Sequence, residues 1–208
     1  MTDLSKTDIA ALERATEREA SMGLRKFFRL LRLRLHTQGF KATLLWMFNV
    51  FNRLVLDRPI RRQCEVTPQL FVGPQFKRNG WRQLRKWGIS GVVNLRREFD
   101  DLSLGVNIPH YLHLPTTDDA PPTLEDLARG VDFIREMIEG GGKVYIHCGA
   151  GVGRAPTMAA AYLITLGDTP QQAYDRIRSN RQFIRPTAGQ REQLQNFYNL
   201  HTKKQPPG

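Results

Sequence analysis

One short stretch of the sequence combines residue types that could carry out nucleophilic chemistry on an anionic group. Cys148 is followed by alternating glycines and, six residues later, by Arg154. Glycines let a backbone turn tightly, so that successive N–H groups can point inward and bind an anion such as phosphate. The planar guanidinium of Arg154 can grip two oxygens of the same group. The predicted phosphate-binding residues are Gly149, Ala150, Gly151, Val152, Gly153 and Arg154.

Cys148 lies at the bottom of the same predicted nest of amides and cation. A positive field of this kind favours the thiolate form of a cysteine, and a thiolate beneath a bound phosphate ester is placed for in-line attack on phosphorus. A structural cysteine before a glycine-rich turn is the simpler alternative, but it does not account for the arginine. A nucleotide-binding loop fits poorly, because the Lys-Ser/Thr ending of such loops is absent.

A leaving alcohol or phenolate needs a proton, which a carboxylic acid on a nearby loop can supply. Asp118 and Asp119 lie in a predicted loop between Pro115 and Pro121, and either could be this acid. The same acid, as a carboxylate, could then activate water. Both aspartates could instead be solvated loop residues.

Short β-like runs alternate with helical patterns from about Cys64 onward. The predicted strands are residues 63–67 and 70–72 as a pair around Pro68, then 91–95, 110–114 and 143–147. The predicted helices are residues 81–87, one that begins at Thr123 and ends before Gly140, 157–166, one capped by Thr169, and 188–200. This alternation implies an α/β fold, a layered domain with a central, mostly parallel sheet flanked by helices. It places Cys148 at a strand-to-helix turn.

A helical extension precedes this domain. Residues 1–61 are rich in Leu, Ala, Arg and Glu, with proline only at Pro59. We therefore predict a helical, basic, amphipathic extension over residues 1–61 and a catalytic domain over residues 62–208. A second apolar helix, over about residues 43–56, is expected to supply packing. Its large apolar residues include Trp46, Met47, Phe48 and Phe51.

The most basic part of the extension is residues 24–35. Its apolar residues, at helical spacing, are Leu24, Phe27, Phe28, Leu31 and Leu35, and its cations are Arg25, Lys26, Arg29, Arg32 and Arg34. Such a helix can lie on an anionic membrane surface. It can equally pack its apolar stripe on the main domain, and both alternatives stay open.

Composition sets the wider limits. The chain has 208 residues and a formal net charge of +11, which favours anionic partners. Two cysteines cannot form a disulfide framework and suit a reducing compartment. The acidic N-terminus does not look like a signal peptide, and no apolar stretch reaches the roughly 18 residues that indicate a spanning helix. We expect a cytoplasmic protein, with peripheral membrane contact as an option.

The loop residues resemble a known family. His147, Cys148 and Arg154 match the H-C-x5-R signature of the cysteine-based protein tyrosine phosphatases, and the short domain resembles the small atypical members of the dual-specificity branch. Weaker segments that carry the resemblance are residues 70–73, 91–96 with Glu98, and 181–186 with Gln190. The resemblance implies a phosphatase fold over about residues 66–198. It also implies hydrolysis of phosphate monoesters through a phosphocysteine at Cys148, without metal or cofactor.

The resemblance also suggests roles for further residues. His147 is expected to orient the loop and to help hold the thiolate, although a His before a Cys would mean little by itself. Asp118 has the family-like spacing to the cysteine and to the Pro-Pro pair, so it is preferred over Asp119 as the acid. Glu98 resembles a family acid that can hold the loop arginine, although a plain surface glutamate is an equal alternative. Gln190 could position water, but a glutamine on the helix surface is the simpler interpretation.

Ala155-Pro156 departs from the family pattern, which usually has Ser or Thr after the arginine with its hydroxyl bonded to the sulfur. Departure of the thiolate from phosphocysteine is therefore expected to be less assisted. The Ala-Pro pair is similar to that of plant phosphatases that act on phosphorylated glucans.

Family resemblance puts phosphotyrosine, phosphoserine and phosphothreonine proteins first among the expected substrates. The basic residues 24–35 motivate a phospholipid alternative, a phosphoinositide or phosphatidylglycerol phosphate, although the loop contains no lysine between Cys148 and Arg154. A phosphoglucan ranks third, and a non-catalytic phosphate-binding scaffold is the rival from another class. Nucleic acid is not expected as a partner.

Overall fold

The computed structural model describes residues 28, 31–32, 35–36 and 39–204. Most of the predicted basic helix at residues 24–35 therefore lies outside the described residues, and its role stays a prediction. Residues 39–51 are helical, as expected for the extension, and continue into a π-helical turn, η1 (Asn52–Leu56). In the part of the chain that the structure describes, no helix is long and apolar enough to cross a membrane.

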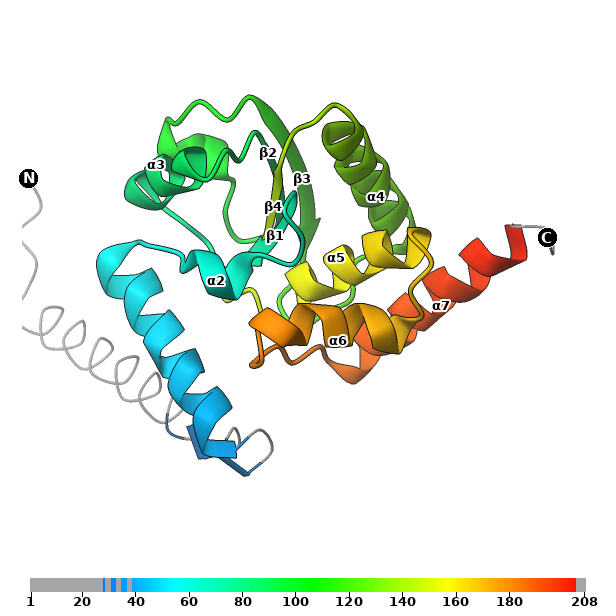
Figure 1. Cartoon of the computed structure of the whole chain (residues 1–208), viewed down its shortest axis with the longest axis horizontal. Coiled ribbons are helices and arrows are strands. Elements are labelled where there is room, and N and C mark those ends of the chain that lie inside the picture. The colour runs from blue at the N-terminus through cyan, green and yellow to red at the C-terminus, as the bar shows by residue number, and fades with distance from the viewer. Residues whose placement is uncertain (1–27, 29–30, 33–34, 37–38, 205–208) are drawn as a thin grey trace, which may run out of the picture. The chain divides into compact units, whose positions relative to one another are not determined.

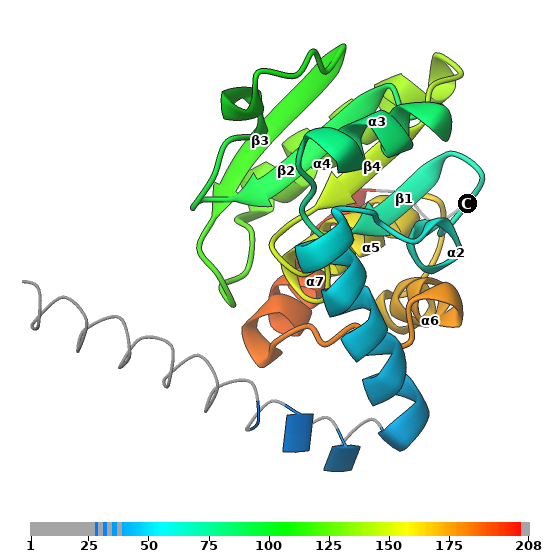
Figure 2. The same cartoon turned by 90° about the vertical axis from the view of Figure 1, so that its left-hand side faces the viewer.

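Four strands form one sheet in which all neighbours run parallel. They are β1 (Leu70–Gly73), β2 (Gly91–Arg96), β3 (His110–Thr116) and β4 (Val144–His147). Their spatial order is β1-β4-β2-β3, which Figure 2 shows with the strands side by side. His147 at the end of β4 is level with Gly73 of β1 and Asn94 of β2. The loop that follows β4 thus starts in the middle of the sheet, at the carboxyl edge of its strands.

Helices cover both faces of the sheet, which confirms the predicted layered α/β architecture (Figure 1). The helices are α2 (Arg61–Cys64), α3 (Arg78–Lys86), the 3₁₀ turn η2 (Asp101–Leu104), α4 (Leu124–Glu139), α5 (Arg154–Thr165), α6 (Pro170–Asn180) and α7 (Ala188–Lys204). Because successive strand residues point to opposite faces, Tyr145 packs with Trp81 and Leu84 of α3. Its neighbours Val144 and Ile146 pack with residues of α4 to α7.

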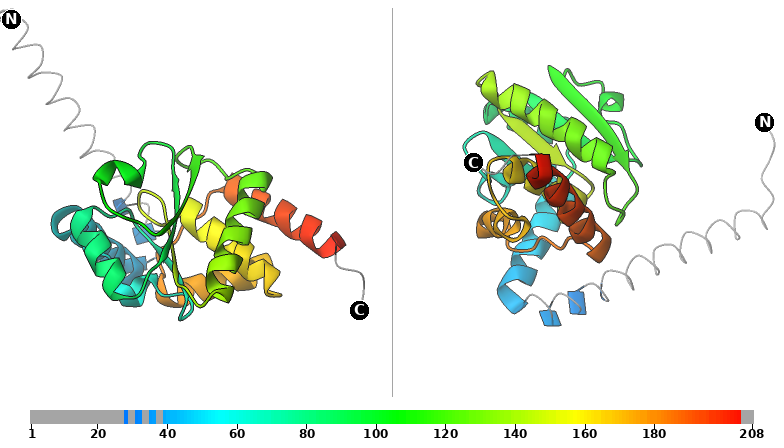
Figure 3. Two further views of the ribbon diagram at one scale, coloured as in Figure 1. Left: turned by 90° about the horizontal axis from the view of Figure 1, so that it is seen from above. Right: turned by 90° about the vertical axis from the view of Figure 1, so that its right-hand side faces the viewer.

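The helix after the cysteine loop is the most deeply buried. Every residue of α5 from Arg154 to Ile164 is buried, and α4, α6 and α7 contact it (Figure 3). The sequence predicted this Ala-rich helix but started it at Thr157. It begins three residues earlier, so Arg154 is its first residue, and the helix sets the position of the guanidinium.

One predicted strand is wrong. Residues 61–64 form α2, and only Glu65 pairs with Phe71 of β1, as an isolated antiparallel bridge. The short alternation of polar and apolar residues also fits a single helical turn. An ion pair between Arg61 and Glu65 at 3.0 Å spans this turn, a spacing typical of a helix.

Candidate active site

The predicted phosphate-binding residues form a turn between β4 and α5. Gly151 has a φ of 66°, in the left-handed region that favours glycine. A Cβ at this position would collide with the backbone carbonyl of Gly73. A Cβ at Gly153 would lie 2.7 Å from Oε1 of Gln190. The glycines therefore let the loop pass close to β1 and to α7.

Donors outside the loop hold its carbonyl groups. Arg181 is 1% exposed, and its Nε donates to the carbonyl of Gly151 at 2.6 Å. Nη2 of Arg181 donates to the carbonyl of Ala150 at 2.9 Å. Two backbone N–H groups act in the same way: that of Gln75 donates to the carbonyl of Gly149 at 3.1 Å, and that of Arg185 donates to the carbonyl of Val152 at 2.6 Å. In a trans peptide the N–H points away from the carbonyl of the same unit. The carbonyls of residues 149–152 all point outward to these donors, so the N–H groups of the residues that follow them point to the inner side of the loop. An anion-binding nest requires this arrangement.

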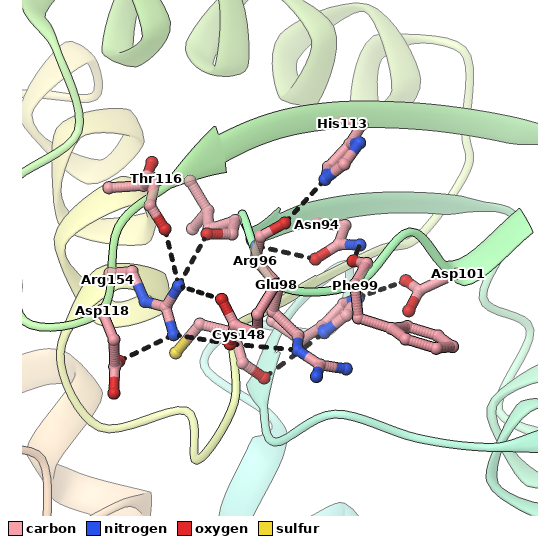
Figure 4. Close-up of polar contacts among 12 residues, drawn as sticks. Asn94, Arg96, Glu98, Phe99, Asp101, His113, Thr116, Asp118, Cys148 and Arg154 are labelled. Atoms are coloured by element: carbon pink, nitrogen blue, oxygen red, sulfur yellow. Dashed lines mark hydrogen bonds and ion pairs between the residues drawn. The ribbon is translucent and has the colours of Figure 1, made fainter. Parts of the chain in front are cut away.

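Arg154 is 2% exposed and is held by backbone and side-chain acceptors (Figure 4). Its Nη1 donates to the carbonyls of Thr116 at 2.7 Å and Leu95 at 3.1 Å. Both carboxylate oxygens of Glu98 accept from the guanidinium at 3.1 Å. Asp118 Oδ1 accepts from Nη2 at 2.7 Å. The structure thus brings both acids that the sequence singled out onto one cation.

These contacts shift the pKa values of Glu98 and Arg154. Burial by itself raises the pKa of Glu98, but the hydrogen bonds and charge of Arg154 outweigh it and lower that pKa to about 2. Burial alone would lower the pKa of Arg154, but the hydrogen bonds that it donates to Glu98 and the nearby negative charges raise it. Both groups stay ionised, so the guanidinium keeps its charge and its orientation.

Replacing Glu98 by glutamine is expected to lower the melting temperature by about 2–4 °C near neutral pH, a small effect because solvent screens the partly exposed carboxylate of Glu98. Glu98 has a folded pKa below its ordinary value of 4.5. Its contribution is therefore present above about pH 4.5 and is lost as the pH falls toward 2. Melting temperatures of the two proteins, measured from neutral pH downward, should converge in acid.

Glu192→Gln, at an exposed position on α7, is the matched control and should show no such convergence. A Glu98→Gln deficit that stays constant down to the lowest pH at which both proteins fold would contradict the assigned ion pair.

The loop that carries Asp118 and Asp119 is hydrogen-bonded to residues at the start of α7. Gln190 is fully buried; its Nε2 donates to the carbonyl of Ala120 at 3.0 Å, and its Oε1 accepts from the Thr187 N–H at 2.9 Å. The Thr187 hydroxyl donates to the carbonyl of Asp119 at 3.1 Å. The expected helix-surface glutamine is therefore wrong. Sequence shows a polar residue on a helix but not that the loop packs over it.

Asp118 and Asp119 differ in what they face. The Asp118 side chain is 76% exposed yet reaches Arg154. Asp119 has a φ of 60° and is tied to α7 through its backbone. The geometry favours Asp118 as the acid, and its catalytic role stays a prediction.

His147 has a buried partner that the sequence did not reveal. Its Nε2 lies 2.6 Å from Oδ2 of Asp101, and both side chains are fully buried. Its Nδ1 lies 3.4 Å from the carbonyl oxygen of Cys148. Asp101 thus sets the orientation of the imidazole beneath the loop. Asp100 directly precedes η2 and is exposed, whereas Asp101, its first residue, is buried. Nothing in the local sequence pattern distinguishes the two.

Cys148 is 3% exposed and lies next to the guanidinium of Arg154, the first residue of α5 (Figure 4). The loop that follows Cys148 turns its N–H groups inward. Together these features define a cysteine-based phosphatase. Residues 70–200 match the family described as "Dual specificity phosphatase, catalytic domain". The chain belongs to that family, which confirms the predicted resemblance.

Two human relatives illustrate the range of the family. The chain is 31% identical to phosphatidylglycerophosphatase and protein-tyrosine phosphatase 1 over 149 residues, which cover 67% of this chain and 74% of the relative. It is 29% identical to serine/threonine/tyrosine-interacting protein over 154 residues, covering 70% of this chain and 69% of that one.

Solved structures show the same fold. The crystal structure of PTPMT1 in complex with PI(5)P has a TM-score of 0.62 and 28% identity, covering 67% of this chain and 96% of that one. The crystal structure of human tyrosine phosphatase-like serine/threonine/tyrosine-interacting protein has a TM-score of 0.59 and 25% identity, covering 67% and 97%.

Proposed function

We propose that this phosphatase hydrolyses phosphate monoesters in two steps at Cys148. The thiolate attacks phosphorus, an S–P bond forms, and the bond to the leaving oxygen breaks as Asp118 gives it a proton. Water then attacks the phosphocysteine, Asp118 takes the water proton, and phosphate and the thiolate are released. Arg154 and the loop amides bind the transferring group.

The observation that carries this proposal is the convergence of Glu98 and Asp118 on the guanidinium of Arg154. It supports a buried guanidinium that keeps its charge and its orientation, with an exposed carboxylic acid directly beside it. These are the requirements for binding a dianion and protonating its leaving group. The supporting roles proposed for His147 and Glu98 are to orient the loop and the arginine.

Phosphorylated proteins with phosphotyrosine, phosphoserine or phosphothreonine are the first proposed substrates, because the chain belongs to the dual-specificity family. The second candidate is a phospholipid. One relative is named a phosphatidylglycerophosphatase, and one similar structure holds PI(5)P. Residues 24–35, with their many arginines, add a proposed peripheral contact with an anionic membrane. The free thiols of Cys64 and Cys148 support a reducing, cytoplasmic location.

A panel of substrates tests this ranking of the proposed substrate classes. The full chain, in the presence of a chelator, would be assayed on a phosphotyrosyl peptide, phosphoinositides, phosphatidylglycerol phosphate, a phosphoglucan and a small aryl phosphate. The highest kcat/KM identifies the substrate class. Failure to hydrolyse even the aryl phosphate would favour a non-catalytic phosphate-binding protein. Two observations motivate this alternative: Ala155 has no hydroxyl, and one relative is named an interacting protein.

Ala155→Ser is expected to speed breakdown of the phosphocysteine several-fold. Ala155 is fully buried in the first turn of α5 and has no hydroxyl to assist the departing sulfur. The wild type should therefore give a burst of released alcohol followed by a slower steady state. Rapid mixing with an aryl phosphate measures both phases. A linear time course without trapped intermediate would show that sulfur departure is not slow.

A further inference from the structure

Figure 1 shows the helical segment that precedes α2, residues 39–56. Several of its large apolar side chains are exposed. The exposed fractions are 40% for Met47, 53% for Phe48, 52% for Phe51, 65% for Val55 and 44% for Leu56. Met47, Phe51 and Val55 follow one another at intervals of four residues, and Phe48 precedes Phe51 by three, so these four share one helical face. Leu56 directly follows Val55 at the end of that face. We call these five residues the apolar stripe. Of the four residues expected to supply packing here, only Trp46 is buried, so the expectation was wrong for the other three.

Exposure on this scale is concentrated in one place. Among the described residues from 57 to 204, the large apolar side chains that are exposed are Leu102 in η2, Leu166 directly after α5 and Leu200 in α7. Single exposed leucines need no explanation, but a contiguous apolar face on a folded protein marks an interaction surface.

The charges around the stripe indicate what the surface contacts. Arg58 and Arg62 follow the stripe and are exposed, and Arg61 beside them pairs with Glu65. Asp57 is the only acid between residues 24 and 64.

The carboxylate of Asp57 is turned inward. It accepts hydrogen bonds from the N–H groups of Lys77 at 2.6 Å and Gly80 at 2.8 Å, at the start of α3. The surface therefore offers apolar area and positive charge.

A hollow adjoins the end of the stripe. Arg58, Arg82 and Lys86 line it together with Asn79, Gln83 and Trp87, and its volume is about 460 Å³. All its charged lining residues are cations, and its amides and cations can bind phosphate oxygens. Arg58 is two residues beyond Leu56, so the hollow and the stripe meet along the chain.

We propose that the apolar stripe, with Arg58, Arg62 and this hollow, is a docking surface for an anionic phospholipid bilayer. The stripe enters the boundary between headgroups and acyl chains, as interfacial amphipathic helices do. The cations bind lipid phosphates. A second copy of the chain is a poorer occupant, because pairing two stripes would bring the arginines of both copies together. The docking surface does not depend on the proposed hydrolysis, since no catalytic group takes part in it.

Co-sedimentation of the full chain with vesicles tests the proposal. Vesicles of phosphatidylcholine alone would be compared with an equimolar mixture of phosphatidylcholine and phosphatidylglycerol, at low and high salt. The wild type should bind the anionic vesicles, more weakly at high salt. Phe48→Gln with Phe51→Gln should weaken this binding by roughly a hundredfold, about tenfold for each half-exposed phenylalanine. Leu166→Gln, at an exposed leucine outside the stripe, should change it less than about twofold.

The arginines have a matched control of their own. Arg58→Gln with Arg62→Gln should weaken binding by at least about tenfold. Arg129→Gln with Arg135→Gln, on α4, makes the same change in net charge and should have little effect. All variants should hydrolyse a small aryl phosphate at the wild-type rate, which shows that they fold.

Three results would overturn the docking surface. The first is that the wild type fails to bind anionic vesicles at low salt. The second is that the variant with both phenylalanines replaced binds them as tightly as the wild type. The third is that the wild type is a dimer without lipid and this variant is a monomer. A wild type that binds vesicles but hydrolyses nothing would leave the docking surface standing and defeat the proposed function alone.

Discussion

Cys148→Ser is expected to abolish turnover while leaving phosphate binding in place. Serine at this position lacks a base to ionise it, so the loss should be on the order of 10⁴-fold or more. The loop should keep its shape, because Arg181, Arg185 and Gln75 hold its carbonyls from outside. The two quantities to measure are hydrolysis of an aryl phosphate and calorimetric binding of inorganic phosphate.

Cys64→Ser provides the matched control. Cys64 is also a free, buried cysteine, and burial raises the pKa of its thiol. It packs on the opposite face of the sheet from α5, in the cluster with Phe71 and Trp81. The Cys64→Ser variant should retain turnover. Near-wild-type activity of Cys148→Ser would reject Cys148 as the nucleophile, and loss of phosphate binding in that variant would show that the sulfur helps to shape the loop.

Asp118→Asn is expected to lower turnover by roughly 10²–10⁴-fold for esters with poor leaving groups, the range of general acid catalysis. The loss should shrink for esters of very acidic phenols, because these leave without a proton. Asp118 Oδ1 lies 2.7 Å from Nη2 of Arg154. A bound phosphate would compete for that N–H, which would free the carboxyl group to face the leaving oxygen. Asparagine keeps the shape and removes the proton.

Asp119→Asn separates the two neighbouring aspartates. Asp119 has a φ of 60°, a conformation that asparagine tolerates, so this variant should keep the loop intact. Its kcat should stay near the wild-type value for all leaving groups. If Asp119→Asn instead shows the dependence on the leaving group and Asp118→Asn does not, the acid is the second residue of the pair.

The sequence by itself determined the loop and the class of fold. Residues 147–154 are contiguous, so the turn, its glycines and the arginine at the helix start follow from local sequence. The alternation of strands and helices predicted the parallel sheet, because each element carries its own periodicity. Even locally, a five-residue pattern was too short to distinguish a strand from the single turn of α2.

Only the tertiary structure decided which residues support that loop. Asp101 is 46 residues from His147, Arg181 is 30 from Gly151, and Gln190 is 70 from Ala120. Each partner became buried because of how the faces of several elements pack together, and no local pattern records that packing. The exposure of the apolar stripe was decided in the same way. Helical periodicity defines an apolar face but not what covers it, so Trp46 is buried while Phe48 and Phe51 of the same helix face solvent.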